Sequence, residues 1–395
     1  MGSFTPSSFF EHLSPVPLDA IYSHKEEFSA DNSESKLILG SGVYRDEESQ
    51  PWVLPSVKKA DEIVARSQGS DRFEYLPIRG CSPFYTAARD LLFGSLGFKE
   101  NRTVSVHTVA GTGANSLGAR FLKETISPSA VWVPDPTWVN HHNIWSLAGV
   151  EVKTYPYWDS SKRSLKFERL LQTLENEAER GDVIILHACA HNPTGVDPTK
   201  EQWRMIASLC ESKGLFPFFD LPSKFHASIK YYQLIQGSLG FASGDPDADA
   251  WAIGYSASRD TLEFAITQSF SKNMGLYGER VGALHFLAAT ADVASTIKGH
   301  LSRLQRGNIS QPPTRGAMIA TTILKSPDLY RSWEHLRTQI GMFSYTGITA
   351  DQVATIRTDS HIYLLESGRI NVAGLNIKNA AYVARAMDAA VRKSA

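Results

Sequence analysis

The feature that most constrains the fold is the alternation of short apolar runs with stretches of helical periodicity along the middle of the chain. Helical patterns lie at 115–126, 164–180 and 198–213. Apolar runs of strand length lie at 103–110, 130–133, 150–157, 182–188, 215–219, 263–270 and 280–288. Strands that are apolar throughout are buried on both faces, as in a parallel sheet covered by helices. The pattern therefore predicts an α/β fold with a mainly parallel central sheet.

Length and charge exclude several classes of function. A chain of 395 residues has room for two or three domains, and 42% hydrophobic with 21% charged residues is a globular balance. The formal net charge of −1 provides no overall field that would attract nucleic acid or an anionic membrane. No apolar run approaches the ~18–20 residues of a membrane span. We expect no nucleic-acid partner and no membrane partner.

Cysteine usage and the N-terminal sequence favour a cytoplasmic protein. Cys81, Cys189 and Cys210 are odd in number and widely spaced, which predicts buried thiols and neither a disulfide framework nor a zinc site. The first residues lack the pattern of a signal peptide or presequence. His142 and His187 have no neighbours at metal-ligand spacing, so we expect no metal site.

Small and polar residues follow the predicted strands, and ligands of α/β proteins bind at that edge of the sheet. Gly111, Thr112 and Gly113 open a helix, where free N–H groups and the helix dipole favour phosphate. This turn is neither a dinucleotide fingerprint nor a P-loop, which disfavours a nicotinamide dehydrogenase. A plain strand-to-helix turn is the alternative. Ser269 and Arg280 could complete a phosphate cradle.

Lys272 and Asp220 carry the clearest chemical signals. Lys272 follows the strand at 263–270, and a desolvated lysine there could form a Schiff base. Asp220 directly follows the apolar strand at 215–219, where a carboxylate is costly unless a cation, such as a protonated pyridine nitrogen, requires it. The alternatives are a solvated loop lysine and a turn or helix-capping aspartate.

Three further residues could contact a ligand bound by Lys272 and Asp220. Trp138 could stack on an aromatic cofactor, Asn192 could hydrogen-bond a phenolate oxygen, and Arg369 could bind a carboxylate. A core tryptophan, an ordinary turn and a strand-edge arginine are the alternative interpretations. Taken together at predicted strand exits, these residues indicate a phosphorylated, protonated aromatic heterocycle that carries an aldehyde. That description fits pyridoxal 5'-phosphate (PLP).

Long stretches of the chain resemble the aspartate aminotransferase family, class I and fold type I of the PLP enzymes. The stretches with this resemblance are 39–47, 75–80, 110–115, 136–144, 187–203, 215–220, 240–251, 268–282, 339–347 and 368–376. The resemblance implies a large domain with a mainly parallel sheet flanked by helices, and a smaller α+β domain built from both chain ends. We expect an N-terminal arm and part of the small domain at 1–50, the large PLP-binding domain at 51–325, and the rest of the small domain at 326–395.

The resemblance also assigns roles within the site. It implies that Lys272 is the Schiff-base lysine and proton shuttle, that Asp220 pairs with the pyridine nitrogen, that Asn192 pairs with the phenolate oxygen, and that Trp138 stacks on the ring. For the phosphate it implies a site made of Gly111, Thr112, Ser269, Arg280 and, from the neighbouring subunit, Tyr75.

For the substrate, the resemblance implies that Arg369 binds the α-carboxylate and that Gly42 lies in a loop that closes over the site. Arg306 matches the position from which the second subunit binds a distal carboxylate. These residues imply a homodimer with shared active sites. The expected reaction is ping-pong transamination through Lys272 between an aspartate- or glutamate-type amino acid and a 2-oxo acid. An aromatic or unusual substrate and a non-catalytic binding paralogue are the alternatives.

The sequence departs from the family pattern at three places. Ala110 stands where the family usually has Ser. The stretch at about 221–239 is longer than the family's short turn, and neither Tyr231 nor Tyr232 is in register with the family tyrosine that bonds the phenolate oxygen. After about Thr338 a helix and a strand of the family pattern are missing. A translated intron and a skipped exon would explain the last two changes.

Overall fold

The structure is a computed structural model, and the seven-stranded sheet at its centre positions the site. The structure describes residues 8–16, 20–40, 42–43, 45–46, 50–67, 69, 73–94, 100–221, 249–331, 343–371, 374–376 and 378–393. The insertion at about 221–239 and the deletion after Thr338 lie outside these residues, apart from Leu221. Within the described residues, no helix is long and apolar enough to cross a membrane.

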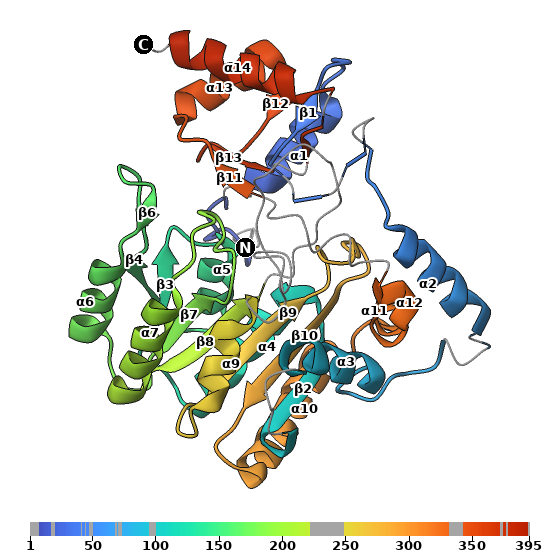
Figure 1. Cartoon of the computed structure of the whole chain (residues 1–395), viewed down its shortest axis with the longest axis vertical. Helices are drawn as coiled ribbons and strands as arrows, with labels where there is room; N and C mark the ends of the chain where they lie inside the picture. Colours follow the sequence, from blue (N-terminus) through green and yellow to red (C-terminus); the bar gives the residue numbers. More distant parts are fainter. Residues whose placement is uncertain are drawn as a thin grey trace, which may run out of the picture.

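The central sheet is mostly parallel, as the alternating pattern predicts (Figure 1). In spatial order its strands are β2 (Thr103–Val109), β10 (Val281–Leu287), β9 (Phe264–Ser269), β8 (Phe216–Leu221), β7 (Val183–His187), β3 (Ala130–Asp135) and β4 (Glu151–Pro156). Only β10 runs antiparallel to its neighbours β2 and β9. The predicted α/β architecture with a mainly parallel sheet is confirmed.

Helices cover both faces of the sheet because successive residues of each strand are buried on opposite sides. Val131 and Val133 of β3 pack in one apolar cluster, whereas Trp132 between them packs in the other. The first cluster includes α4 (Ala110–Thr125), α5 (Asn140–Leu147) and α10 (Ala291–Asn308). The second includes α6 (Phe167–Glu177), α7 (Lys200–Lys213) and α9 (Trp251–Ser258). A third cluster joins α2 (Pro55–Ser67), α3 (Ser82–Phe93), α11 (Thr314–Lys325) and α12 (Pro327–Arg331).

The two chain ends pack together as a smaller unit above the sheet (Figure 1). Its elements are α1 (Ala20–Ala30), β1 (Leu37–Ile38), β11 (Phe343–Tyr345), α13 (Ala350–Ser360), β12 (Ile362–Tyr363), β13 (Arg369–Asn371) and α14 (Ala380–Lys393). Strand β1 pairs in parallel with β12, so residues more than 300 positions apart share one sheet. The expected domain boundaries at 50 and 325 stay predictions.

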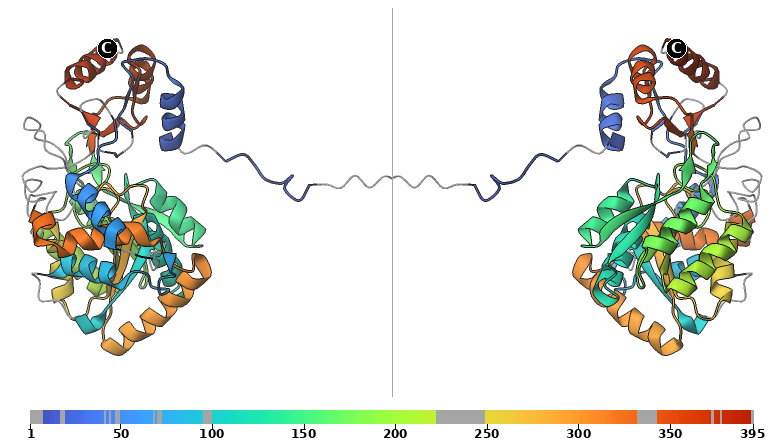
Figure 2. Two further views of the ribbon diagram at one scale, coloured as in Figure 1. Left: turned by 90° about the vertical axis from the view of Figure 1, so that its right-hand side faces the viewer. Right: turned by 90° about the vertical axis from the view of Figure 1, so that its left-hand side faces the viewer.

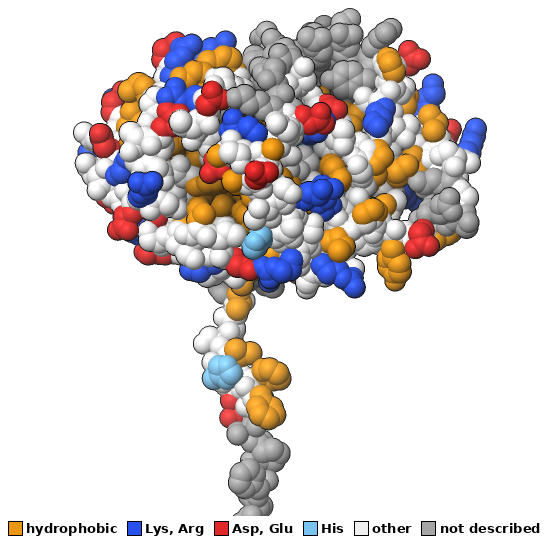
Figure 3. All heavy atoms as spheres, turned by 90° about the horizontal axis from the view of Figure 1, so that it is seen from below, with side chains coloured by type: hydrophobic (Ala, Val, Ile, Leu, Met, Phe, Trp, Pro, Cys, Tyr) orange, Lys and Arg blue, Asp and Glu red, His pale blue; other side chains and the backbone are white. Residues whose placement is uncertain are grey.

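Residues 8–16 extend away from the body (Figures 2 and 3). Their apolar side chains, Phe9, Phe10, Leu13 and Val16, are 63–91% exposed. Such exposure of apolar side chains to water is unfavourable.

Local predictions fail where tertiary pairing overrides periodicity. The helix expected from 115 begins at Ala110, because the glycine turn itself forms the first turn of α4. The helix expected from 164 begins at Phe167, because Ser164–Leu165 form β6 and pair with β5 (Trp158–Asp159). Asp220 does not follow its strand but lies within β8, opposite His187 and Thr267 in the neighbouring strands. The turn or helix-capping interpretation of Asp220 is therefore wrong.

Candidate active site

The predicted site residues gather at the carboxyl edge of the parallel strands. Arg280 reaches the same edge from the start of β10, because that strand runs antiparallel to its neighbours. Arg369 was expected at a strand exit like the other site residues, but it does not lie at one. It is the first residue of β13 in the small unit, where it is buried with only 7% exposure.

The phosphate cradle predicted around Gly111 is built by close backbone approaches. The N–H of Ala110 donates to the carbonyl of Arg280 at 3.1 Å, and both residues have left-handed backbones (φ 56° and 54°). A Cβ on Gly111 would lie 2.9 Å from Cβ of Ser269. The N-terminus of α4, the Ser269 side chain and Arg280 therefore lie together, an arrangement that favours an anion.

Asp220 is the centre of a buried hydrogen-bond network. Its Oδ1 accepts from Thr267 Oγ1 at 2.6 Å and from Asn115 Nδ2 at 3.1 Å. Its Oδ2 lies 3.2 Å from His141 Nε2. Asn115 also donates to the carbonyl of Gly111 at 3.0 Å, so the network joins the carboxylate to the phosphate cradle.

The environment keeps Asp220 ionised. Burial raises the pKa of this carboxyl, but hydrogen bonds from His141 and Thr267 and the charges of His141 and His187 outweigh burial and hold it well below its usual range. Ligand atoms of His141, His187 and Asp220 lie within 4.8 Å of one another, a spacing that could hold a metal ion. The sequence predicts no metal there. Both imidazoles make other bonds: Nδ1 of His141 lies 2.8 Å from Thr137 Oγ1, and Nδ1 of His187 accepts from the N–H of Asn192.

Lys272 is half-buried and lies among cations. Burial, with the charges of Arg369 and Arg280, lowers the pKa of its ammonium to about 8. Its Nζ lies 5.1 Å from the ring centroid of Tyr277. The solvated-loop interpretation is therefore wrong, because Lys272 is half-buried, and its lowered pKa favours the neutral, nucleophilic amine more than in an ordinary lysine.

Arg369 and Asn192 contact each other directly. Nη1 of Arg369 donates to Oδ1 of Asn192 at 3.2 Å, and Nη2 donates to the carbonyl of Gly40 at 3.0 Å. Asp197 holds the loop before Asn192 by accepting the N–H groups of Ala190 and His191. One guanidinium thus bridges the small unit and the large one.

Trp138 is half-buried and packs at the edge of the core cluster around α4 and α5. Its ring meets the imidazole of His141 edge-on, with centroids 5.2 Å apart. The ring thus lies beside the Asp220 network and keeps part of its surface accessible, as a stacking role requires.

Three predicted residues do not join this cluster. Tyr75 is 82% exposed. Arg306, in the last turn of α10, is also exposed and donates to Ser310 Oγ. Gly42 is buried in the segment after β1, close to the carbonyl of Val43 that accepts from Asn371. The roles expected for Tyr75 and Arg306 in the site of another subunit stay predictions.

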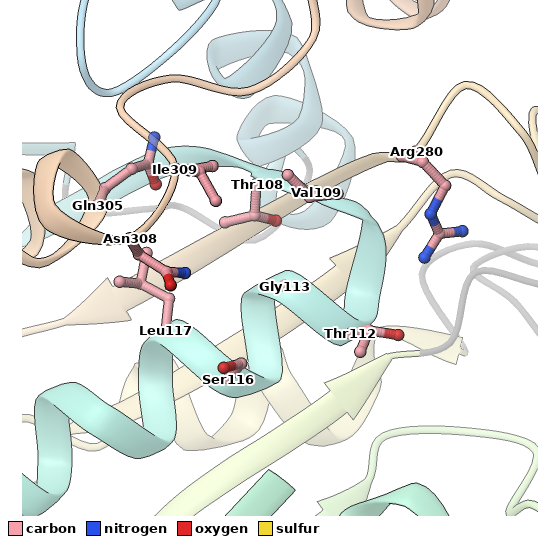
Figure 4. Close-up of a pocket in the computed structure, with 10 residues that line it drawn as sticks. All are labelled: Thr108, Val109, Thr112, Gly113, Ser116, Leu117, Arg280, Gln305, Asn308 and Ile309. Carbon is pink, nitrogen blue, oxygen red and sulfur yellow. The ribbon is translucent and has the colours of Figure 1, made fainter. Parts of the chain in front are cut away.

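A cavity of about 290 Å³ lies next to the cradle (Figure 4). Arg280 and Thr112 lie at one end, whereas Gln305, Asn308 and Ile309, from the end of α10, line the other. The residues of the predicted phosphate cradle are therefore open to a space that the end of α10 borders.

Several residues of the site escaped sequence analysis, notably Asn115, His141 and Thr267. Periodicity contains a signal for two of them. Asn115 lies one helical turn after Gly111, and Thr267 lies two residues before Ser269 in the same strand. His141 has no such signal, because its contact with Asp220 spans 79 residues.

The residues present fit PLP. A carboxylate offers about four acceptor positions, and the described residues use three of those of Asp220. Capacity remains for one more donor, such as a protonated ring nitrogen. Lys272 would bind the aldehyde carbon, and the cradle with Arg280 would bind the phosphate.

Comparison with known proteins agrees with this geometry. The sequence model of the family "Aminotransferase class I and II" matches residues 34–335. An L-tyrosine:2-oxoglutarate aminotransferase of Aspergillus ustus is 39% identical over 95% of this chain and 77% of its own length. The cytoplasmic aspartate aminotransferase of Schizosaccharomyces pombe is 38% identical over 97% of this chain and 98% of its own.

Solved structures show the same fold. Aspartate aminotransferase from Saccharomyces cerevisiae cytoplasm superposes with a TM-score of 0.88 at 33% identity, covering 98% of this chain and 99% of its own. An aromatic-amino-acid aminotransferase from Burkholderia pseudomallei, covalently bound to PLP, gives 0.87 at 33% identity, covering 97% and 100%.

Proposed function

Because the chain belongs to the class I and II aminotransferases, we propose that it transfers the amino group of a dicarboxylic L-amino acid, aspartate or glutamate, to a 2-oxo acid. PLP, held at Lys272, is the proposed cofactor. The observation that carries the proposal is the pairing of opposite electrostatic environments at one sheet edge. Asp220 is held ionised, whereas the pKa of Lys272 is lowered to about 8.

Each residue has a physical role in this reaction. When bound, PLP supplies the electron sink that stabilises charge at the substrate Cα. Asp220 would keep the ring nitrogen protonated. The neutral amine of Lys272 would take the proton from Cα as a general base. Arg369 would bind the α-carboxylate and orient the Cα–H bond toward that amine.

We propose a homodimer with shared sites. Tyr75 and Arg306 carry groups suited to phosphate and carboxylate, yet both are exposed on the described chain. The exposed apolar side chains of residues 8–16 provide further surface for a second copy. In the dimer, Arg306 of one chain would bind the distal carboxylate in the site of its partner.

An aromatic amino donor is the second candidate. The Aspergillus ustus relative is named for L-tyrosine and 2-oxoglutarate. Because 2-oxoglutarate is a dicarboxylate, Arg306 would serve as the acceptor site for either donor. We further propose a cytoplasmic location, as named for the relatives from Schizosaccharomyces pombe and Gallus gallus.

The decisive experiment mixes the purified, PLP-loaded protein with single amino acids and records its visible absorbance. Aspartate or glutamate should convert the band of the aldehyde form of the cofactor to that of the amine form, and 2-oxoglutarate should reverse the change. Lys272→Ala should abolish the band, whereas Lys298→Ala, at an exposed position on α10, should not. Conversion by tyrosine alone would favour the second candidate, and no conversion by any amino acid would refute the proposal.

A further inference from the structure

The buried side chain of Gln305 connects the two chain segments that carry Tyr75 and Arg306, which are exposed residues of the proposed dimeric site. Gln305 is only 1% exposed and lies one residue before Arg306 in α10. Its Nε2 donates to the carbonyl of Ile78 at 2.5 Å and to the carbonyl of His107 at 3.1 Å. An amide group has two such donors, so both are used.

The bond to Ile78 fixes the segment that carries Tyr75. His107 holds the same segment by two further hydrogen bonds. Its N–H donates to the carbonyl of Arg79 at 3.0 Å, and its Nδ1 accepts the N–H of Cys81 at 3.4 Å. Tyr75, three residues before Ile78, is therefore exposed on a segment whose following residues are anchored to the body.

The same side chain fixes the direction of Arg306. Successive residues of a helix project about 100° apart, so burial of Gln305 turns Arg306 outward, where it is exposed. Other contacts of this end of α10, Arg120 to Asn308 and Arg303 to Glu124, are on the surface. Exposed pairs contribute little because water screens them. The buried amide is the firmer attachment, and Figure 4 shows Gln305 on the cavity wall opposite Arg280.

We propose that Gln305 is a positioning residue that sets Arg306 and Tyr75 relative to each other for the active site of the partner subunit. This inference rests on the proposed dimeric aminotransferase. It predicts that Gln305 affects binding of the distal carboxylate and the phosphate without touching either ligand.

The first test is Gln305→Met, which keeps the volume and removes both donors. KM for aspartate and 2-oxoglutarate should rise about 5- to 30-fold, the equivalent of about 1–2 kcal/mol. KM for tyrosine should change less than twofold, and the dissociation constant of PLP from the apoprotein should rise. Gln305→Asn keeps the amide on a shorter side chain. If the Met variant does not fold, Gln305→Asn takes its place in the test, and it should raise the same KM values.

Gln268→Met is the matched control, because Gln268 is equally buried at 1% exposure and its oxygen lies 3.2 Å from Nε2 of His285, which belongs to β10 and to neither segment. It should lower the melting temperature without separating the two substrate classes. If Gln305→Met raises the KM values of aspartate and tyrosine equally, as a general structural defect would, the inference is wrong.

Hybrid dimers test whether the effect acts across the interface. In a dimer of one Gln305→Met chain and one Lys272→Ala chain, the only functional lysine lies in the Gln305→Met chain. Its site receives Tyr75 and Arg306 from the other chain, where Gln305 is intact. KM for aspartate should therefore return to the wild-type value. A KM that stays raised would overturn the inference alone, whereas an inactive wild-type protein would overturn the proposed function with it.

Discussion

Nε2 of His141 lies 3.2 Å from Oδ2 of Asp220, while Nδ1 of the same imidazole lies 2.8 Å from Thr137 Oγ1. A carboxylate can only accept, so Nε2 of His141 donates to Asp220, and the Thr137 contact at Nδ1 holds the ring in place. The contact connects the helix after β3 to the buried strand β8. Asp220 can therefore remain ionised although it is only 4% exposed.

Replacing the carboxylate should remove most of the catalytic power. Asp220→Asn retains the shape but not the charge that would hold a ring nitrogen protonated. We expect kcat to fall by about 10²–10³-fold, the range for loss of one preorganised electrostatic group. His141→Phe should reduce kcat less, because Thr267 and Asn115 still donate to Asp220. Steady-state kinetics would measure both, and a larger loss in His141→Phe would contradict this order.

Lys272 should titrate far below an ordinary lysine. Its pKa is lowered from 10.5 to about 8, so labelling of the apoprotein amine by an acylating reagent should have its midpoint near pH 8. Between about pH 8 and 10.5 the folded state binds fewer protons than the unfolded state, so this group makes the apoprotein more stable as pH rises through that window.

Arg369→Met tests whether a neighbouring charge lowers the pKa of Lys272, because it removes a cation that disfavours the ammonium form. The labelling midpoint should move upward, toward 10.5. Arg315→Met, which removes an arginine paired with Asp61 on the surface, should leave it unchanged. A midpoint that is insensitive to Arg369 would show that burial and Arg280 set the pKa without it.

The two arginines should differ in substrate dependence. Arg369→Ala should raise KM for every amino acid, because all have an α-carboxylate. Arg306→Ala should raise KM for aspartate and 2-oxoglutarate only. The KM of each of these two substrates should rise on the order of 10²-fold, the cost of truncating a charged partner. Comparing aspartate with tyrosine in both variants measures this, and equal losses for the two substrates in Arg306→Ala would disprove its assignment.

Gly282 should be essential to the phosphate cradle. A Cβ at this position would lie 2.4 Å from the carbonyl carbon of Ala110, so Gly282→Ala must displace the start of α4. We expect the affinity for PLP to fall about tenfold through this overpacking, and the affinity for pyridoxal, which has no phosphate, to fall less. Gly299→Ala, where a Cβ meets nothing within 4 Å, is the control. Equal losses for both ligands would locate the damage outside the cradle.

The apolar runs and the residues that separate them were enough to predict the sheet. Each of the seven expected strands is present, because a buried strand requires continuous apolar residues whatever surrounds it. The cluster of Gly111, Lys272 and Asp220 at one edge could also be predicted, because parallel strands bring their carboxyl ends together.

Contacts between distant segments could not be predicted from such local sequence patterns. Ser164–Leu165 have the periodicity of the helix that follows, yet they form a strand because Trp158–Asp159 lie beside them. Arg369 appears in sequence as an isolated strand-edge arginine, and its burial against Asn192 follows from packing of the two chain ends.

The sequence by itself determined the fold class and the identity of the groups that could hold a phosphorylated cofactor, because residue type and period follow from local chemistry. The tertiary structure decided their electrostatic states. The pKa of Lys272 depends on Arg369 and Arg280, and that of Asp220 depends on His141 and Thr267. Charge interactions depend on distance in space and on burial. Both arise only when the strands, helices and chain ends have packed.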